Sequence, residues 1–390
     1  MKLLLLSTSS SRNAGGLYNS VRNLGQALLK LNHYNPTVIA YNDEHSDVDI
    51  AAYEPLPVVQ YKTIGPKGLA FSLELKKKFN HLAPDIIHQQ GIYLYSSLVN
   101  HNYSKKHRIP YLISPRGMLD PWILNNNPLK KEIGFKLYER SNLKGAACIH
   151  ALGMPEYHAI RKFGCDNPIA VIPNGVFLPS PLNLDSYSPP AWKADDDRKI
   201  LLFLSRLHPK KGLENLMHAV KIDEKFRNKW KIIIAGESNT SVYLNSLIEL
   251  QDKLQLKNDI LFIGAQYHAD KDLCFRYADA FILPSFSEGM PMAVLEAWSY
   301  SLPAIITEEC NLPEGFEEAA AIKIEPNIDS IVDGLKKLNN FSDMELKRIG
   351  NNGYNLVRNN FTWEAIAQQM EEVYNWILEK GPRPNVVKVD

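Results

Sequence analysis

The sequence predicts two α/β domains in series, each built on a doubly wound parallel sheet. In both halves of the chain, short apolar runs of strand length alternate with longer stretches whose apolar residues recur at helical spacing. A proline-rich, acidic segment at 177–199 separates the halves. A chain of 390 residues with 45% apolar content is long enough to bury two such cores.

The predicted elements follow one another in order. Strand-like runs in the first half lie at 2–8, 37–41, 85–89, 110–115, 147–152 and 170–175, and those in the second half at 200–205, 231–236, 259–264, 280–285 and 303–307. Four prolines between 179 and 190 prevent the intervening segment from continuing a sheet, because proline lacks the backbone N–H. We therefore expect a first domain over 1–176, a linker over 177–199, a second domain over 200–360, and a last amphipathic helix over 361–380.

Charge is divided unevenly although the net charge is only +1. Residues 1–180 carry 20 Lys and Arg against 12 Asp and Glu, while the remainder carries 24 against 31. The basic runs at 76–78 and 105–108 suit an acidic membrane surface or a phosphate-bearing acceptor, or they are ordinary solvated faces. The scattered cysteines and the short apolar start favour a reduced, cytoplasmic protein without a signal peptide or a membrane span.

The segment after the run at 280–285 combines groups that suit a phosphorylated sugar. Pro291 favours a helix that begins near Met290, and a helix start attracts phosphate through its unpaired N–H groups. The amides expected to be free are those of Gly289, Met290 and Met292. Glu288 lies just before this helix and Glu296 inside it, so one carboxylate could meet a sugar and the other a ribose.

Further candidates follow other strands. Arg206 comes directly after 200–205, and Lys211 precedes the next helix, so both cations could hold one diphosphate. Gly15 and Gly16 would let a ligand approach the backbone after the first strand. Their context is not G-x-G-x-x-G, which argues against a dinucleotide enzyme. Asn174, in a Pro-Asn-Gly turn, has either a ligand role or only a turn role.

Two acidic groups are candidates for the Asp-x-Asp metal site that metal-dependent sugar transferases use. Asp47 and Asp49 lie in a polar loop, and the triplet Asp195–Asp197 lies in the linker. We interpret both as solvated charge and expect no metal, with Arg206 and Lys211 supplying the positive charge instead.

The combination of Gly15-Gly16, the Pro-Asn-Gly turn at 173–175, the loop at 205–212 and the E-x7-E spacing of Glu288 and Glu296 resembles the retaining glycosyltransferases of family four. The resemblance covers essentially the whole chain. It implies the GT-B fold, in which two Rossmann-like domains face each other across a cleft, and no cofactor or metal. It also implies that the last helix crosses back, so that 361–390 joins the first domain.

The resemblance also implies roles for residues at matching positions. Arg206 and Lys211 would hold the donor diphosphate, Glu296 the ribose, and Glu288 with the backbone from Gly289 to Met292 the donor sugar. Gly16 would approach the phosphate, and the backbone near Gly264 would meet the nucleobase. Arg116 stands where many relatives carry a histidine in the first-domain loop, and arginine cannot act as a neutral acceptor.

The function expected from these observations is transfer of a hexose from a nucleotide sugar to a glycan or lipid-linked acceptor. UDP-glucose or a related UDP-hexose is the expected donor, and GDP-mannose is the alternative. A non-catalytic subunit that only binds sugar nucleotides is the alternative of another class. We expect a cytoplasmic protein with peripheral contact to the inner face of the membrane through its basic half, and no nucleic-acid partner.

Overall fold

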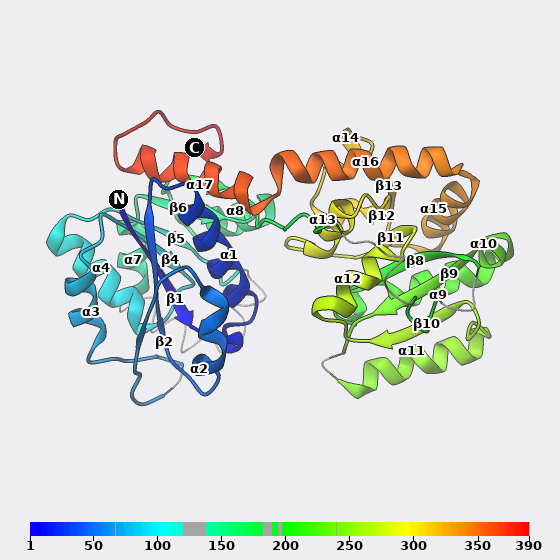
Figure 1. Ribbon diagram of the computed structural model, residues 1–390, viewed down its shortest axis with the longest axis horizontal. Helices are drawn as coiled ribbons and strands as arrows, with labels where there is room; N and C mark the ends of the chain where they lie inside the picture. Colours follow the sequence, from blue (N-terminus) through cyan, green and yellow to red (C-terminus); the bar gives the residue numbers. More distant parts are fainter. Residues whose placement is uncertain (67, 120–137, 182–188, 194–196, 239, 390) are drawn as a thin grey trace. The chain divides into compact units, whose positions relative to one another are not determined.

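The computed structural model describes residues 1–390 except 67, 120–137, 182–188, 194–196, 239 and 390 (Figure 1). The chain forms two compact units. Unit 1 comprises Met1–Gly175 and Trp363–Asp390, and unit 2 comprises Val176–Thr362. Each unit is an α/β structure built on one sheet, which confirms the predicted fold class.

Unit 1 contains an eight-stranded sheet in the order β14-β7-β6-β5-β4-β1-β2-β3. All its strands pair in parallel except β14, which is antiparallel to β7. The strands are β1 (Lys2–Ser9), β2 (Asn35–Tyr41), β3 (Val58–Tyr61), β4 (Ile86–Gln90), β5 (Tyr111–Ser114), β6 (Cys148–Ala151), β7 (Ile169–Val171) and β14 (Val387–Lys388). The α-helices are α1 (Gly16–Lys30), α2 (Ser46–Asp49), α3 (Leu75–Leu82), α4 (Tyr95–His107), α7 (Arg140–Gly145), α8 (Met154–Lys162) and α17 (Trp363–Ile377).

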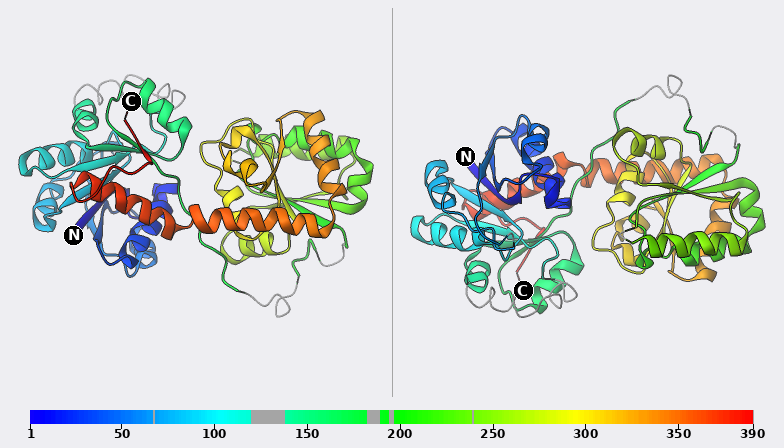
Figure 2. Two further views of the ribbon diagram at one scale, coloured as in Figure 1. Left: turned by 90° about the horizontal axis from the view of Figure 1, so that it is seen from above. Right: turned by 90° about the horizontal axis from the view of Figure 1, so that it is seen from below.

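Successive residues of these strands bury their side chains on opposite faces of the sheet. Leu3 and Leu5 of β1 pack into the core that α1 and α17 cover, whereas Leu4 and Leu6 pack into the core on the other face. Helix α17 lies beside α1 (Figure 2). The C-terminal helix therefore belongs to unit 1, as the family resemblance implies.

Unit 2 contains a six-stranded parallel sheet in the order β10-β9-β8-β11-β12-β13. The strands are β8 (Lys199–Leu204), β9 (Trp230–Ala235), β10 (Ile260–Gly264), β11 (Ala280–Leu283), β12 (Ala304–Thr307) and β13 (Ala321–Ile324). The α-helices are α9 (Leu213–Ile222), α10 (Glu224–Lys229), α11 (Ser241–Leu254), α12 (His268–Arg276), α13 (Met292–Ser299), α14 (Glu314–Glu317), α15 (Ile328–Asn340) and α16 (Asp343–Asn360). The central strands are continuously apolar because helices cover both faces of a parallel sheet.

A chain of buried polar side chains crosses the core of unit 1 beneath α17. His150 Nε2 contacts the carbonyl of Ile172 at 2.7 Å and must donate, so Nδ1 accepts from the Ser114 hydroxyl at 2.7 Å. The Ser114 oxygen then accepts from His88 Nε2 at 2.6 Å, and His88 Nδ1 accepts from the Tyr374 hydroxyl at 2.7 Å. Each donated hydrogen in this row of hydrogen bonds has an acceptor, provided that both histidines are neutral. Burial accordingly lowers the pKa of His88 well below its usual value and that of His150 to about 3.

Acidification should destabilise unit 1 through these two histidines. In the unfolded chain a histidine has a pKa of about 6.5, so the unfolded state binds more protons than the folded state below that pH. The stabilisation is complete above about pH 6.5 and is lost as the pH falls, with a slope approaching 1.4 kcal/mol per pH unit for each histidine.

Urea unfolding at about pH 7.5 and about pH 5.5 measures this loss of stability. His150→Gln should be less stable than the wild type at the higher pH but should lose less stability on acidification. His107→Gln, a change at an exposed histidine, is the control and should keep the wild-type slope. If the free energy of unfolding fell equally with pH in all three proteins, the conclusion that His150 is neutral in the folded protein would be contradicted.

Candidate functional site

The sheet of unit 2 reverses its winding between β8 and β11. From β8 the chain proceeds outward to β9 and β10, and it then returns to β11 on the other side and proceeds to β12 and β13. Ligands of open α/β sheets bind beyond the carboxyl ends of the strands at such a reversal. The loop after β8, which contains Arg206 and Lys211, and the loop after β11, which contains Glu288, are therefore placed at the edge where a ligand is expected.

These two loops touch through their backbones. Gly212 has a φ of 72°, and a Cβ at this position would lie 2.2 Å from the carbonyl oxygen of Pro284. The amide of Phe286 donates to the carbonyl of Lys210 at 2.8 Å. A side chain at residue 212 would therefore push the loops apart.

Lys211 and Glu288 form a largely buried ion pair where the loops meet. Lys211 Nζ lies 2.5 Å from Glu288 Oε1, and the exposed fractions of the two side chains are 14% and 9%. The same carboxylate oxygen accepts from the Ser285 hydroxyl at 2.6 Å. The backbone of Glu288 is also fixed, because its amide donates to the Glu309 carbonyl at 3.0 Å and its carbonyl accepts from Asn311 Nδ2 at 2.6 Å. The pair is thus rigidly held before any ligand binds.

Arg206 differs from Lys211 in its surroundings. Its side chain is exposed, and within the described ranges it makes no hydrogen bond or ion pair. Arg206 directly follows Ser205, the first residue after β8. The site therefore combines one cation that is already paired with a second cation that is available to a ligand.

The start of α13 corrects one sequence prediction. The helix begins at Met292 rather than near Met290, and Pro291 is its N-cap rather than its first residue. Pro291 has φ −83° and ψ 85°, close to an inverse γ-turn, so the amide of Met292 donates to the carbonyl of Met290 at 3.1 Å. The prediction of a free amide at Met292 is therefore wrong, while the amide of Gly289 has no hydrogen-bond partner among the residues that the structure describes.

Glu296 projects from α13 and pairs with α12. Its Oε1 lies 2.6 Å from Lys271 Nζ, and the exposed fractions of the two side chains are 27% and 31%. Sequence analysis did not identify Lys271, because nothing in the local sequence of α12 distinguishes it from an exposed lysine. The pair keeps the Glu296 carboxylate partly accessible and fixed in orientation.

The ends of β9 and β10 carry an accessible backbone and an exposed aromatic ring. Gly264 is exposed with a φ of 72°, a Cβ there would meet no atom within 4 Å, and its carbonyl accepts from the amide of Gly236 at 2.8 Å. Tyr267 is 59% exposed, and its hydroxyl donates to Glu237 Oε1 at 3.1 Å. This tyrosine was missed, although an aromatic residue soon after a strand end was the available signal.

The sheet of unit 1 reverses between β1 and β4 in the same way. Gly15 (φ 59°) and Gly16 follow β1, and a Cβ on either glycine would meet no atom within 4 Å. Just before them, Arg12 pairs with Asp49, whose side chain is only 6% exposed. The interpretation of Asp49 as solvated charge is therefore wrong, because its carboxylate anchors this loop.

The other acidic candidates were Asp47 and the triplet Asp195–Asp197. Asp195 and Asp196 lie outside the described residues. Within the described part of the chain, no group of three or more His, Cys, Asp or Glu residues is arranged to hold a metal ion.

A buried carboxylate holds the loop after β4. Glu139 is fully buried, and it accepts from the Tyr93 amide at 2.7 Å and from Asn142 Nδ2 at 2.7 Å. Burial raises the pKa of Glu139. Tyr93 has a φ of 70°, an uncommon conformation for a tyrosine, so Glu139 offsets local strain. This arrangement could not be read from the sequence because the partners are 46 residues apart.

Arg116 and Asn174 are brought together at the same edge of the unit 1 sheet. Arg116 Nη1 donates to Asn174 Oδ1 at 2.8 Å, and its Nε donates to Gln90 Oε1 at 2.8 Å. Desolvation lowers the pKa of Arg116 to about 10, so the guanidinium stays charged at neutral pH. Arg116 therefore links the end of β4 to the turn after β7.

Comparisons with known proteins agree with this arrangement. Residues 188–356 match the family described as "Glycosyl transferases group 1", and residues 14–178 match "Glycosyltransferase Family 4". A subunit of the phosphatidylinositol N-acetylglucosaminyltransferase of Homo sapiens is 26% identical over 57% of this chain and 44% of its own length. UDP-Gal:alpha-D-GlcNAc-diphosphoundecaprenol alpha-1,3-galactosyltransferase of Escherichia coli is 29% identical over 53% of this chain and 54% of its own length.

The chain thus spans about half the length of these curated relatives. Among solved structures, HepE of Anabaena in complex with UDP has a TM-score of 0.75 at 17% identity, and the match covers 96% of this chain and 100% of that one. Because the two family matches together span most of both units, the chain belongs to glycosyltransferase family four, the group 1 glycosyltransferases, and has their GT-B fold.

Proposed function

We propose that this protein is a retaining, metal-independent glycosyltransferase that moves a hexose from a nucleoside diphosphate sugar to a hydroxyl of a glycan or lipid-linked acceptor. The observation that carries the proposal is the Lys211–Glu288 ion pair, 2.5 Å long, at the reversal point of the unit 2 sheet, beside the exposed Arg206. Two cations and a fixed carboxylate at such an edge suit a ligand that carries both a diphosphate and hydroxyl groups.

The chemistry follows from where charge develops. When the anomeric C–O bond breaks, negative charge grows on the departing diphosphate, and Arg206, Lys211 and the Gly289 amide would stabilise it. Lys211 has three N–H donors, so it can bind a phosphate oxygen without leaving Glu288. The acceptor hydroxyl would attack from the face that the diphosphate leaves, and a donor phosphate oxygen would take its proton. Glu288 would orient the transferred sugar.

The remaining donor contacts come from two further positions. Glu296, fixed by Lys271, suits the ribose diol because a carboxylate accepts hydrogen bonds from both hydroxyls. The exposed Tyr267 ring and the open backbone at Gly264 suit the nucleobase. On this proposal, the backbone from Gly289 to Met292 contacts the donor sugar, and Gly15 and Gly16 admit the phosphate on the unit 1 side.

UDP-glucose or a related UDP-hexose is the proposed donor. The E. coli relative is named for UDP-Gal, and HepE was solved with UDP-glucose. GDP-mannose remains the alternative. A ligand that binds only the folded protein raises its melting temperature, so a thermal-shift panel of nucleotide sugars should show the largest rise with a UDP-hexose. A larger rise with GDP-mannose would instead select the alternative.

The proposed acceptor is a glycan or a lipid-linked molecule at the inner face of the membrane. Two relatives are named for acceptors of that kind, one for phosphatidylinositol and one for a diphosphoundecaprenol-linked sugar. No helix among the described residues is long and apolar enough to cross a bilayer. Peripheral contact through the basic unit 1 would keep such an acceptor within reach.

Substitution of the two cations tests the reaction. Lys211→Ala and Arg206→Ala should each lower kcat by about 10²-fold or more, since loss of one preorganised charged donor typically costs about 3 kcal/mol of transition-state stabilisation. Release of nucleoside diphosphate in the presence of acceptor measures this. Lys210→Ala removes the same charge one residue away and should keep most activity.

Near-normal turnover by both variants would contradict the proposed roles. A wild-type protein that binds the donor but releases no nucleoside diphosphate with any acceptor would instead favour the non-catalytic subunit.

Tyr267 separates stacking from hydrogen bonding in nucleobase recognition. Tyr267→Ala should weaken nucleoside diphosphate binding about tenfold, because stacking a base on an aromatic ring contributes about 1–3 kcal/mol. Tyr267→Phe loses only the bond to Glu237 and should bind nearly as tightly as the wild type. Calorimetric titration measures both, and equal affinity of Tyr267→Ala and the wild type would exclude the stacking role.

A further inference from the structure

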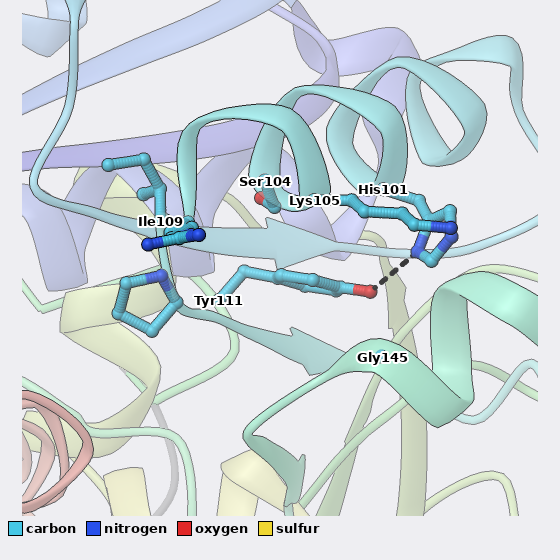
Figure 3. A pocket seen from close by; sticks show the side chains of 8 residues that line it. His101, Ser104, Lys105, Ile109, Tyr111 and Gly145 are labelled. Atoms are coloured by element: carbon cyan, nitrogen blue, oxygen red, sulfur yellow. Dashed lines mark hydrogen bonds between the residues drawn. The ribbon is translucent and has the colours of Figure 1, made fainter.

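A pocket lies in unit 1 at the edge of the sheet opposite the loops after β1 and β4. It is an open pocket with a volume of about 370 Å³, lined by the last turns of α4, the first residue of β5 and the end of α7 (Figure 3). Reactants of open α/β sheets bind at the carboxyl edge, whereas this pocket is at the amino edge of β5. It is therefore separate from the site of the proposed reaction.

The lining combines an apolar floor with basic groups. The residues are His101, Ser104, Lys105, Arg108, Ile109, Pro110, Tyr111 and Gly145. None of them is acidic. Lys105 and Arg108 are exposed, and neither forms an ion pair within the described part of the chain. Positively charged residues at the C-terminus of a helix interact favourably with the helix dipole. This explains why the residues at the end of α4 are basic, but it does not explain the pocket beside them.

Hydrogen bonds fix the inner wall of the pocket. The Tyr111 hydroxyl donates to the carbonyl of Asn142 at 2.7 Å, so at 3.2 Å it must accept from Nδ1 of His101 (Figure 3). The neutral His101 ring then has its hydrogen on Nδ1, and Nε2 remains for a further contact. Tyr111 itself is 3% exposed, so the hydroxyl and the ring form a rigid wall.

Gly145 keeps the pocket open. A Cβ at this position would lie 2.5 Å from the Tyr111 hydroxyl and 3.0 Å from Nδ1 of His101. Any other residue would therefore displace the two side chains that form the inner wall.

We propose that this pocket binds a phosphate group attached to a small organic body, with Arg108 and Lys105 on the phosphate oxygens. Arginine binds phosphate through paired N–H groups and lysine through a point charge, and both side chains line the pocket. Ile109, Pro110 and the Tyr111 ring provide an apolar surface for the adjoining carbon atoms. The phosphate belongs either to a soluble phosphomonoester or to a lipid head group. The site goes beyond the proposed transfer reaction and does not depend on it.

Three variants separate a defined site from diffuse positive charge. Arg108 has a φ of 57°, in the left-handed region that favours glycine, so Arg108→Gly removes the guanidinium without a loss of fold stability. Lys105→Gln removes the second cation. Lys106→Gln is the matched control, because Lys106 is exposed in the same helical turn but does not line the pocket.

Two binding measurements distinguish the sources of phosphate. Glycerol 3-phosphate is titrated calorimetrically into each protein, and flotation is measured with phosphatidylcholine vesicles with and without phosphatidic acid. Arg108→Gly and Lys105→Gln should weaken binding about tenfold or more relative to Lys106→Gln, the effect of losing a hydrogen bond to a charged group. Phosphate binding at the donor site is common to all three variants and cancels in this comparison, while Lys211→Ala reports it separately.

Selective loss of glycerol 3-phosphate binding would support the pocket with a soluble ligand. Selective loss of flotation on phosphatidic acid alone would support it with a lipid head group. An equal loss in Lys106→Gln, or no loss in a folded Arg108→Gly, would overturn the proposal. Because the readout is binding rather than turnover, these results stand whether or not the transfer reaction is found.

Discussion

The backbone contact at Gly212 is the constraint on which the site of unit 2 depends. A parallel sheet brings the carboxyl ends of β8 and β11 to one edge, but their loops meet only because residue 212 has no side chain between its Cα and the carbonyl of Pro284. That contact sets the distance between Lys211 and Glu288, which come from loops 77 residues apart in the chain. The winding of the sheet places the two loops at the same edge, and Gly212 allows them to approach closely enough for Lys211 and Glu288 to pair.

The buried ion pair that results has an energetic consequence for ligand binding. Removing two charges from water is costly, and their mutual attraction offsets this cost only with good geometry and further hydrogen bonds. Glu288 receives such a bond from Ser285, and its backbone is held on both sides. The cost of desolvating and orienting Lys211 is therefore incurred on folding, so the phosphate of the proposed donor would meet a cation already in place.

The sequence predicted the apolar strands and the residues that follow them, because burial imposes a pattern that is local in the chain. The sequence could not predict which side chains pair with one another across different elements. Lys271 pairs with Glu296 across two helices, Asp49 anchors Arg12 from 37 residues away, and Glu139 holds Tyr93. These pairings depend on how elements pack. The start of α13 was misplaced for a local reason, since proline is compatible both with a first helical residue and with the inverse γ-turn that Pro291 adopts.

The two sheet reversals differ in what surrounds them, and Arg116 shows the difference. In unit 2 the reversal carries cations, one of them unpaired among the described residues. In unit 1 the positive charge of Arg116 is committed to the side chains of Gln90 and Asn174, which tie the end of β4 to the turn after β7. Asn174 is also two residues beyond Ile172, where the chain of hydrogen bonds from Tyr374 ends. An arginine held in this way fixes the loop after β5 against the end of β4 and the turn after β7, and its guanidinium donates hydrogen bonds but accepts none. Arg116 is therefore held as a positioning residue, and the proposed mechanism assigns the role of base to the donor phosphate rather than to this side chain.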